Sequence, residues 1–174
     1  KQKEMELLTE VNLVLFIFRL VIGLTIFAHG WNKFFGGGRI PGTGRWFESI
    51  GVRQGKLNAY LAASTELCVG FLLSVGLFTT FASAGLIGLM VVAGWTVNRN
   101  NGFFIIKEGW EYIFVLAVVA MTIATLGPGK WSLDNAFDLA SKLDGWAGFF
   151  ISLLMGVGAG LAQLFIFYRP KKVL

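Results

Sequence analysis

Five side chains are the strongest candidates for chemistry in this sequence: His29, Lys33, Glu66, Asn98 and Glu111. All five lie within or at the ends of long apolar segments, where ionisable groups cost free energy and often serve a function. His29 and Lys33 are four residues apart, so a helix places both on one face. A histidine near a carboxylate can pass protons or hydrogen-bond the head group of a quinone.

Helix geometry places these side chains toward one end of a bundle. At about 1.5 Å per residue, Glu66 lies roughly 13 Å in from that end, and Arg19 lies roughly 9 Å in from the opposite end. The functional interpretation makes the five residues a binding site for a cofactor. The alternative is that Lys33 or Arg19 neutralises Glu66 and the charges only stabilise the bundle.

The counts of cysteine and histidine exclude several redox centres. The chain has one cysteine, Cys68, and one histidine, His29. One thiol cannot form an intramolecular disulfide, an iron–sulfur cluster or a thiolate zinc site, and one histidine cannot supply both axial ligands of a haem. We therefore expect no metal site and no covalently bound cofactor, and a redox cofactor such as quinone must be diffusible or held by a partner.

The elements that position these residues are membrane helices. Hydrophobic residues make up 55% of the 174 residues and charged residues 14%, against about 25% charged residues in soluble domains. The apolar residues form five segments, each near the roughly 20 residues that cross a bilayer, at 11–35, 57–78, 80–97, 110–126 and 146–168. The sequence predicts an all-α integral membrane protein.

The basic residues predict its orientation. Of fifteen Lys and Arg residues, ten fall in segments on one side, four fall on the side of the N-terminus, and Arg19 lies inside the first apolar segment. The positive-inside rule then places the loop at 36–56 and the C-terminus in the cytoplasm. The net charge of +5 is therefore a signal of topology, and nucleic acid is not an expected partner.

Short interfacial helices are predicted at 44–51 and 132–143. In the second, Ser132 is a suitable N-cap, Leu133 and Phe137 share an apolar face, and Asp134 and Asp138 share a polar one. Gly156 and Gly160 form a G-x-x-x-G motif, which suits close helix contact and could serve oligomerisation.

Several ordered motifs resemble the DoxX family of small bacterial and archaeal membrane proteins over about residues 13–134. In addition to Glu111, they are RLVIG at 19–23, AHGWNKFFG at 28–36, WFESIG at 46–51, ELCVGFLLSVGL at 66–77 and LGPGKWSLD at 126–134. The resemblance implies a four-helix membrane core at 11–134, with His29, Lys33, Glu66 and Glu111 at the family's recurring polar positions. The segment at 146–168 would be a fifth transmembrane helix, with a surface for docking to other membrane subunits.

Some relatives of this family form the membrane part of a thiosulfate:quinone oxidoreductase, and others are associated with redox or sulfur-handling partners. The resemblance therefore implies a membrane subunit of a redox or respiratory assembly in a prokaryotic cell membrane, facing quinone and lipid and not a complete enzyme alone. One alternative is a structural accessory or assembly subunit of a larger membrane complex. A small-molecule carrier ranks third, because it needs a polar path across the bundle and the polar residues gather at one side.

Overall fold

The computed structural model describes residues 2–170, with side chains described for 8–140 and 142–170. Helices are the regular elements of this part of the chain, and an isolated bridge joins Val52 to Tyr168. In chain order the elements are α1 (Gln2–Phe35), α2 (Arg39–Ser49), α3 (Gly55–Val75), α4 (Thr79–Ala93), η1 (Gly94–Asn98), η2 (Arg99–Asn101), η3 (Ile105–Lys107), α5 (Glu111–Leu126), α6 (Leu133–Ala136), α7 (Ala140–Leu143) and α8 (Gly145–Phe167).

Four helical segments are long and apolar enough to cross a membrane, so the predicted all-α, multi-pass membrane fold is confirmed. They are Leu8–Phe35, Gly55–Val75, Thr79–Asn101 and Gly145–Phe167. The remaining apolar segment, 110–126, also forms a helix, α5, but its 16 residues fall short of the roughly 20 that a full crossing needs. It is short because the chain before Glu111 forms a loop containing η2 and η3.

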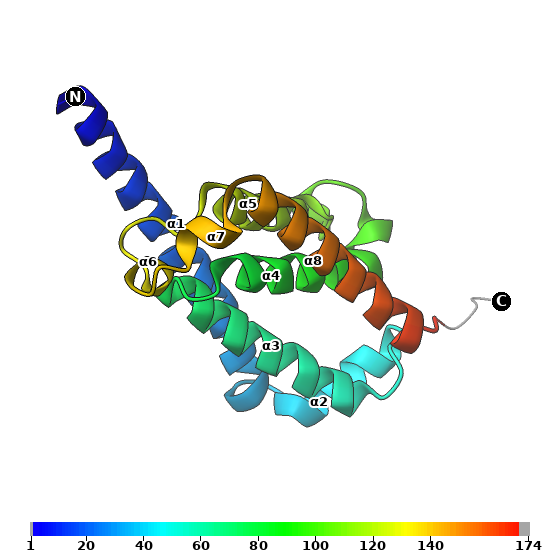
Figure 1. Cartoon of the computed structure of the whole chain (residues 1–174). Coiled ribbons are helices and arrows are strands. Elements are labelled where there is room, and N and C mark those ends of the chain that lie inside the picture. Colours follow the sequence, from blue (N-terminus) through cyan, green and yellow to red (C-terminus); the bar gives the residue numbers. More distant parts are fainter. Residues whose placement is uncertain (1, 171–174) are drawn as a thin grey trace.

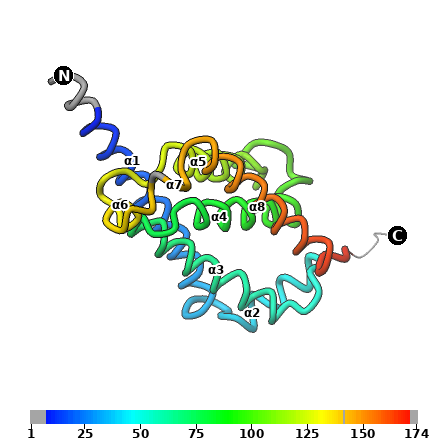
Figure 2. The backbone as a smooth tube through the Cα atoms, viewed as in Figure 1, coloured from blue at the N-terminus to red at the C-terminus, as the bar shows by residue number. Residues whose placement is uncertain are grey.

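The helices form two groups: α1, α2 and α3 pack together, and so do α4, α5 and α8. Figure 1 shows α4 at the centre, with α3 on one side and α8 on the other, and α5 also packs on α4 and α8. Figure 2 shows α1 running behind α3, its most extensive partner. Leu73 of α3, Leu86 of α4 and Leu116 of α5 belong to one buried core cluster, which joins the two groups.

Glycines set the closest helix contacts. A Cβ atom added at Gly70 of α3 would lie 2.6 Å from the carbonyl oxygen of Gly23 of α1, closer than a carbon and an oxygen can pack. A Cβ atom at Gly156 of α8 would lie 2.6 Å from the carbonyl oxygen of Ala84 of α4, and one at Gly160 would lie 3.0 Å from that of Gly88. The G-x-x-x-G face of α8 is therefore used inside this chain and is not free for the oligomer contact considered from the sequence.

The two interfacial segments differ from their predicted form. The first is an 11-residue helix, α2, that begins five residues earlier than expected and packs on α1 and α3 through Ile40. In place of one helix over 132–143 there are two single turns, α6 and α7, because the chain between them has Asp138 at φ +55°, a conformation that ends a right-handed helix. Ser132 caps α6 as predicted, its Oγ atom accepting a hydrogen bond from Asn135 N.

Candidate functional site

A largely apolar cavity of about 230 Å³ lies between the two helix groups, at the end of the bundle where α2 packs. Residues of α1, α2, α3, α4, η1, α5 and α8 all contribute to its wall. His29, Lys33 and Glu66 are the ionisable lining residues that the sequence had singled out. The fold therefore brings three of the five predicted site residues to the wall of one cavity.

Lys33 and Glu66 form an ion pair at the cavity wall. Lys33 Nζ lies 2.7 Å from Glu66 Oε1 and 2.6 Å from Oε2, and the two side chains are only 20% and 14% exposed. Gly30 allows this pairing, because its missing side chain lets α1 approach α3: a Cβ atom there would lie 2.7 Å from Ala63 O. Lys33, and not Arg19, is thus the partner of Glu66.

His29 lies one helical turn before Lys33 and also lines the cavity. Among the described residues its ring has no hydrogen-bond partner. Its nitrogens are therefore available to a molecule in the cavity, within the field of the Lys33–Glu66 pair.

The cavity also has polar lining residues that sequence reasoning did not select: Thr96 of η1, Tyr112 of α5 and Gln163 of α8. Gln163 Nε2 donates to Asn58 Oδ1 at 3.1 Å, and Asn58 Nδ2 donates to Arg53 O at 2.8 Å. Gln163 could have been found, because it is the one amide side chain in the apolar segment 146–168. Tyr112 carried no comparable signal beside the other aromatic residues at helix ends.

Asn98 and Glu111 lie outside the cavity lining and organise the loop before α5. Asn98 Nδ2 donates to Glu108 O at 2.7 Å and to Gly109 O at 3.3 Å. Glu111 Oε2 accepts from Ile105 N at 2.9 Å. Both side chains satisfy backbone groups of an exposed loop, which accounts for polar residues at these helix ends.

A second polar centre lies at the opposite end of the bundle, around the turn between α3 and α4. Arg19 is fully buried and donates to Leu73 O at 3.2 Å and Trp131 O at 2.6 Å. Asp134 is 5% exposed and accepts from Phe78 N at 2.7 Å and Thr79 N at 2.9 Å. The prediction of Asp134 on a polar outer face was wrong, because the α6 turn folds inward.

The two buried charges match the helix ends that they contact. The last carbonyls of α3 carry partial negative charge and attract the Arg19 guanidinium, whereas the first amides of α4 carry partial positive charge and attract the Asp134 carboxylate. Asp134 also donates its own backbone N–H to Gly76 O at 2.8 Å. Arg19 and Asp134 therefore stabilise the α3–α4 turn, and Arg19 contacts this turn instead of neutralising Glu66.

Among the described residues, no three His, Cys, Asp or Glu side chains lie close enough together to hold a metal ion. The candidate site is thus an apolar cavity with one ion pair, one histidine and three neutral polar side chains, suited to binding a small organic molecule.

Comparison with known proteins gives relatives but no activity. An uncharacterised protein of Haemophilus influenzae is 26% identical over 143 residues, covering 78% of this chain and 90% of the relative. An uncharacterised membrane protein of Mycobacterium tuberculosis is 31% identical over 127 residues, covering 67% and 77%. No solved structure matches the chain. The DoxX family model matches residues 14–99, a region that includes His29, Lys33 and Glu66, and this protein belongs to the DoxX family.

Proposed function

We propose that this chain is the membrane subunit of a redox or respiratory assembly in a prokaryotic cell membrane, and that its cavity binds the head group of a quinone. The observation that carries the proposal is the cavity itself: an apolar space with the Lys33–Glu66 pair and the ring of His29 at its wall. Apolar walls with a few polar groups are typical of sites that hold and orient an organic ligand.

The lining residues fit a quinone head group. Its ring is apolar, and its two carbonyl oxygens need hydrogen-bond donors. Lys33, His29 and Tyr112 come from two different helices, α1 and α5, and can donate from different sides of the cavity. At about 230 Å³ the cavity is smaller than the roughly 300–1,000 Å³ of a site for a complete drug-sized ligand, so only the head group would lie inside.

The side chains supply proton transfer and orientation rather than electrons. A bound quinone would accept two electrons and two protons on reduction. His29 can exchange a proton with a hydrogen-bonded oxygen, and Glu66 can exchange one through Lys33 or water. A partner subunit would deliver or remove the electrons, so this chain is not a complete enzyme alone.

The accessory role is the second candidate, and the ion pair also favours it. Lys33 and Glu66 satisfy each other within the chain, as they would if the pair only stabilised the packing of α1 on α3. In that case the protein would act through its outer surface, by anchoring or assembling other membrane subunits.

One experiment distinguishes the quinone-binding role from the accessory role. The protein is purified from the native membrane in mild detergent, and mass spectrometry identifies the extracted quinones and the co-purifying proteins. The quinone retained per protein should fall about tenfold in His29→Ala, which loses a hydrogen bond of about 1.5 kcal/mol to the head group. It should also fall in Glu66→Gln, which removes the charge that holds Lys33 Nζ at the cavity wall. Glu111→Gln is the matched control, because Glu111 lies outside the cavity lining and glutamine keeps an oxygen for Ile105 N.

The quinone proposal fails if the wild type retains no quinone, or if all three variants retain as much as the wild type. Co-purification of membrane subunits with every variant would then support the accessory role. Gel filtration of each variant shows whether the fold is intact.

A further inference from the structure

A second apolar depression, of about 430 Å³, lies between α4–η1 and α5. We call it the α4–α5 groove. Met90 and Gly94 on one side, and Ile113 and Ala117 on the other, are each four residues apart and so share a helix face. Gly94 brings the helices together, since a Cβ atom there would lie 3.2 Å from Ile113 Cγ2.

One end of the groove carries a cation between aromatic rings. Arg99 lines the groove, with its guanidinium carbon 4.4 Å from the centre of the Trp95 ring and 5.9 Å from that of Tyr168. The only ion pair among the described residues joins Lys33 to Glu66, so Arg99 has no carboxylate partner there. Its positive charge is available to an anion at the mouth of the groove.

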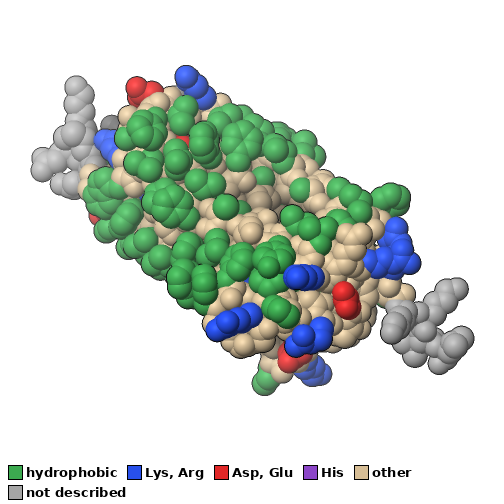
Figure 3. Space-filling model, turned by 90° about the horizontal axis from the view of Figure 1, so that it is seen from below, with side chains coloured by type: hydrophobic (Ala, Val, Ile, Leu, Met, Phe, Trp, Pro, Cys, Tyr) green, Lys and Arg blue, Asp and Glu red, His purple; other side chains and the backbone are tan. Residues whose placement is uncertain are grey.

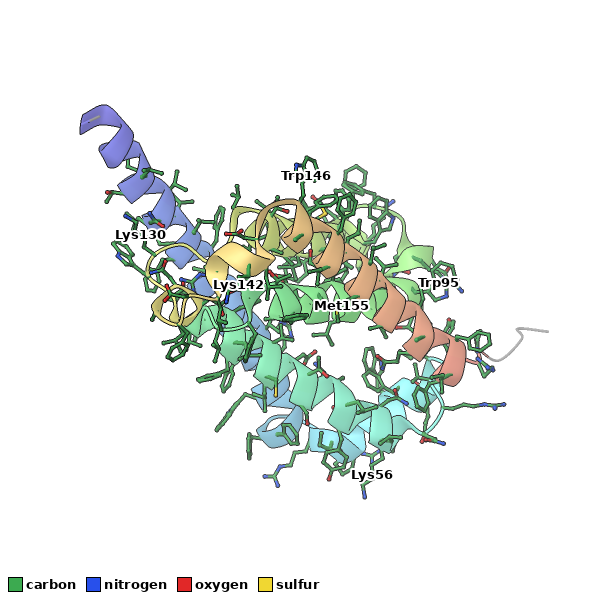
Figure 4. The ribbon with its side chains drawn as sticks, viewed as in Figure 1. Lys56, Trp95, Lys130, Lys142, Trp146 and Met155 are labelled. Carbon is green, nitrogen blue, oxygen red and sulfur yellow. The ribbon has the colours of Figure 1, made fainter. Side chains whose placement is uncertain are left out.

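Further positive charge gathers at the same end of the molecule. Backbone hydrogen bonds from Arg53 N to Phe167 O and from Arg169 N to Gly51 O bring both arginines beside the end of α8, where Tyr168 contacts Arg99. Figure 3 shows Lys and Arg side chains concentrated near this end, next to a flank covered by hydrophobic side chains. Figure 4 shows Trp95 pointing outward at the end opposite Lys130 and Lys142.

We propose that the α4–α5 groove binds one anionic phospholipid, with its phosphate at Arg99 and one acyl chain along Met90, Gly94, Ile113 and Ala117. In a membrane the apolar floor must be covered by protein or by acyl chains, and indole rings such as those of Trp95 and Trp110 lie at the level of lipid head groups. An unpaired arginine at that level attracts anionic lipid over zwitterionic lipid.

Native mass spectrometry of the full-length protein in detergent tests this assignment, with dioleoyl phosphatidylglycerol and dioleoyl phosphatidylcholine added at equal concentration. The wild type should retain one phosphatidylglycerol about fivefold more strongly than one phosphatidylcholine, which is the selectivity expected from a single arginine near the surface. Arg99→Gln should abolish the preference. Lys56→Gln is the charge-matched control, because Lys56 lies at the start of α3, away from Trp95 (Figure 4), and should leave the preference unchanged.

Ala117→Phe provides a second, charge-neutral test, since it fills the floor of the groove without altering Arg99. This variant should lose the tightly retained phosphatidylglycerol while keeping the wild-type gel-filtration profile. Equal retention of the two lipids by the wild type, equal effects of Arg99→Gln and Lys56→Gln, or full retention by Ala117→Phe would each overturn the proposal.

The test of lipid binding is independent of the quinone proposal, although Met90 and Ile113 line both the groove and the cavity. Glu66→Gln should leave phosphatidylglycerol retention unchanged. If Ala117→Phe lowers retained quinone while lipid retention stays as in the wild type, the groove holds a quinone tail and the lipid assignment is wrong.

Discussion

Replacing Asp134 by alanine should destabilise the turn between α3 and α4 more than any other single change to a carboxylate at that end of the bundle. The carboxylate accepts hydrogen bonds from Phe78 N and Thr79 N. These are the amides of the N-cap residue and of the first residue of α4, and they have no partner within the helix. It also offsets the charge of Arg19, which is buried in the same region.

The magnitude follows from these contacts. A hydrogen bond to a charged group contributes about 1.5–3 kcal/mol, and in membrane proteins single polar contacts often contribute less, about 0.6–1.7 kcal/mol. Taking about 1.5 kcal/mol for each of the two bonds gives a loss of about 3 kcal/mol for Asp134→Ala. Asp134→Asn keeps one acceptor oxygen and should lose about half as much.

Reversible unfolding in mixed micelles, followed by far-ultraviolet circular dichroism, measures this difference. Asp138→Asn is the control, because it removes the same charge from a nearby residue and asparagine tolerates the positive φ at that position. A loss below about 1 kcal/mol for Asp134→Ala, or equal losses for Asp134→Asn and Asp138→Asn, would refute the role assigned to the carboxylate.

Two further predictions concern helix packing and the ion pair. Gly156→Leu places a side chain against the Ala84 carbonyl and should lower the free energy of unfolding by about 2 kcal/mol or more. Gly158→Leu is the control and should change the free energy of unfolding little, because there is open space around the Cβ position of Gly158. Equal melting temperatures of the two variants would contradict the packing of α8 on α4. Lys33→Met leaves Glu66 without its partner and should lower the free energy of unfolding by about 2 kcal/mol. The double variant Lys33→Met/Glu66→Gln should regain most of this stability, and the same unfolding experiment in micelles measures both variants. A double variant as unstable as Lys33→Met would show that Lys33 acts mainly by packing.

Local sequence patterns were enough to predict the membrane fold and part of the candidate site. The long apolar segments predicted the helices because a bilayer requires continuous apolar length, and the Gly127–Pro128–Gly129 stop ended α5 where expected. The spacing of His29 and Lys33 and the depth of Glu66 predicted that these three would meet. Helix periodicity and rise determine such relations without knowledge of the packing.

Other features depended on contacts between distant segments. The sequence predicted Asn98 and Glu111 as members of the candidate site. Each instead forms hydrogen bonds with backbone groups of the loop before α5, because that loop turns back on itself. Gln163 reaches the cavity only because α8 packs on α4 through small residues.

The amino-acid sequence by itself determined that this protein is helical, lies in a membrane and carries His29, Lys33 and Glu66 within reach of one another, because these properties follow from local composition and helix geometry. Only the tertiary structure decided that Glu66 pairs with Lys33 and not with Arg19, and that Asp134 is buried against amides 55 and 56 residues earlier in the chain. Long-range packing selects among partners that local sequence leaves equally possible.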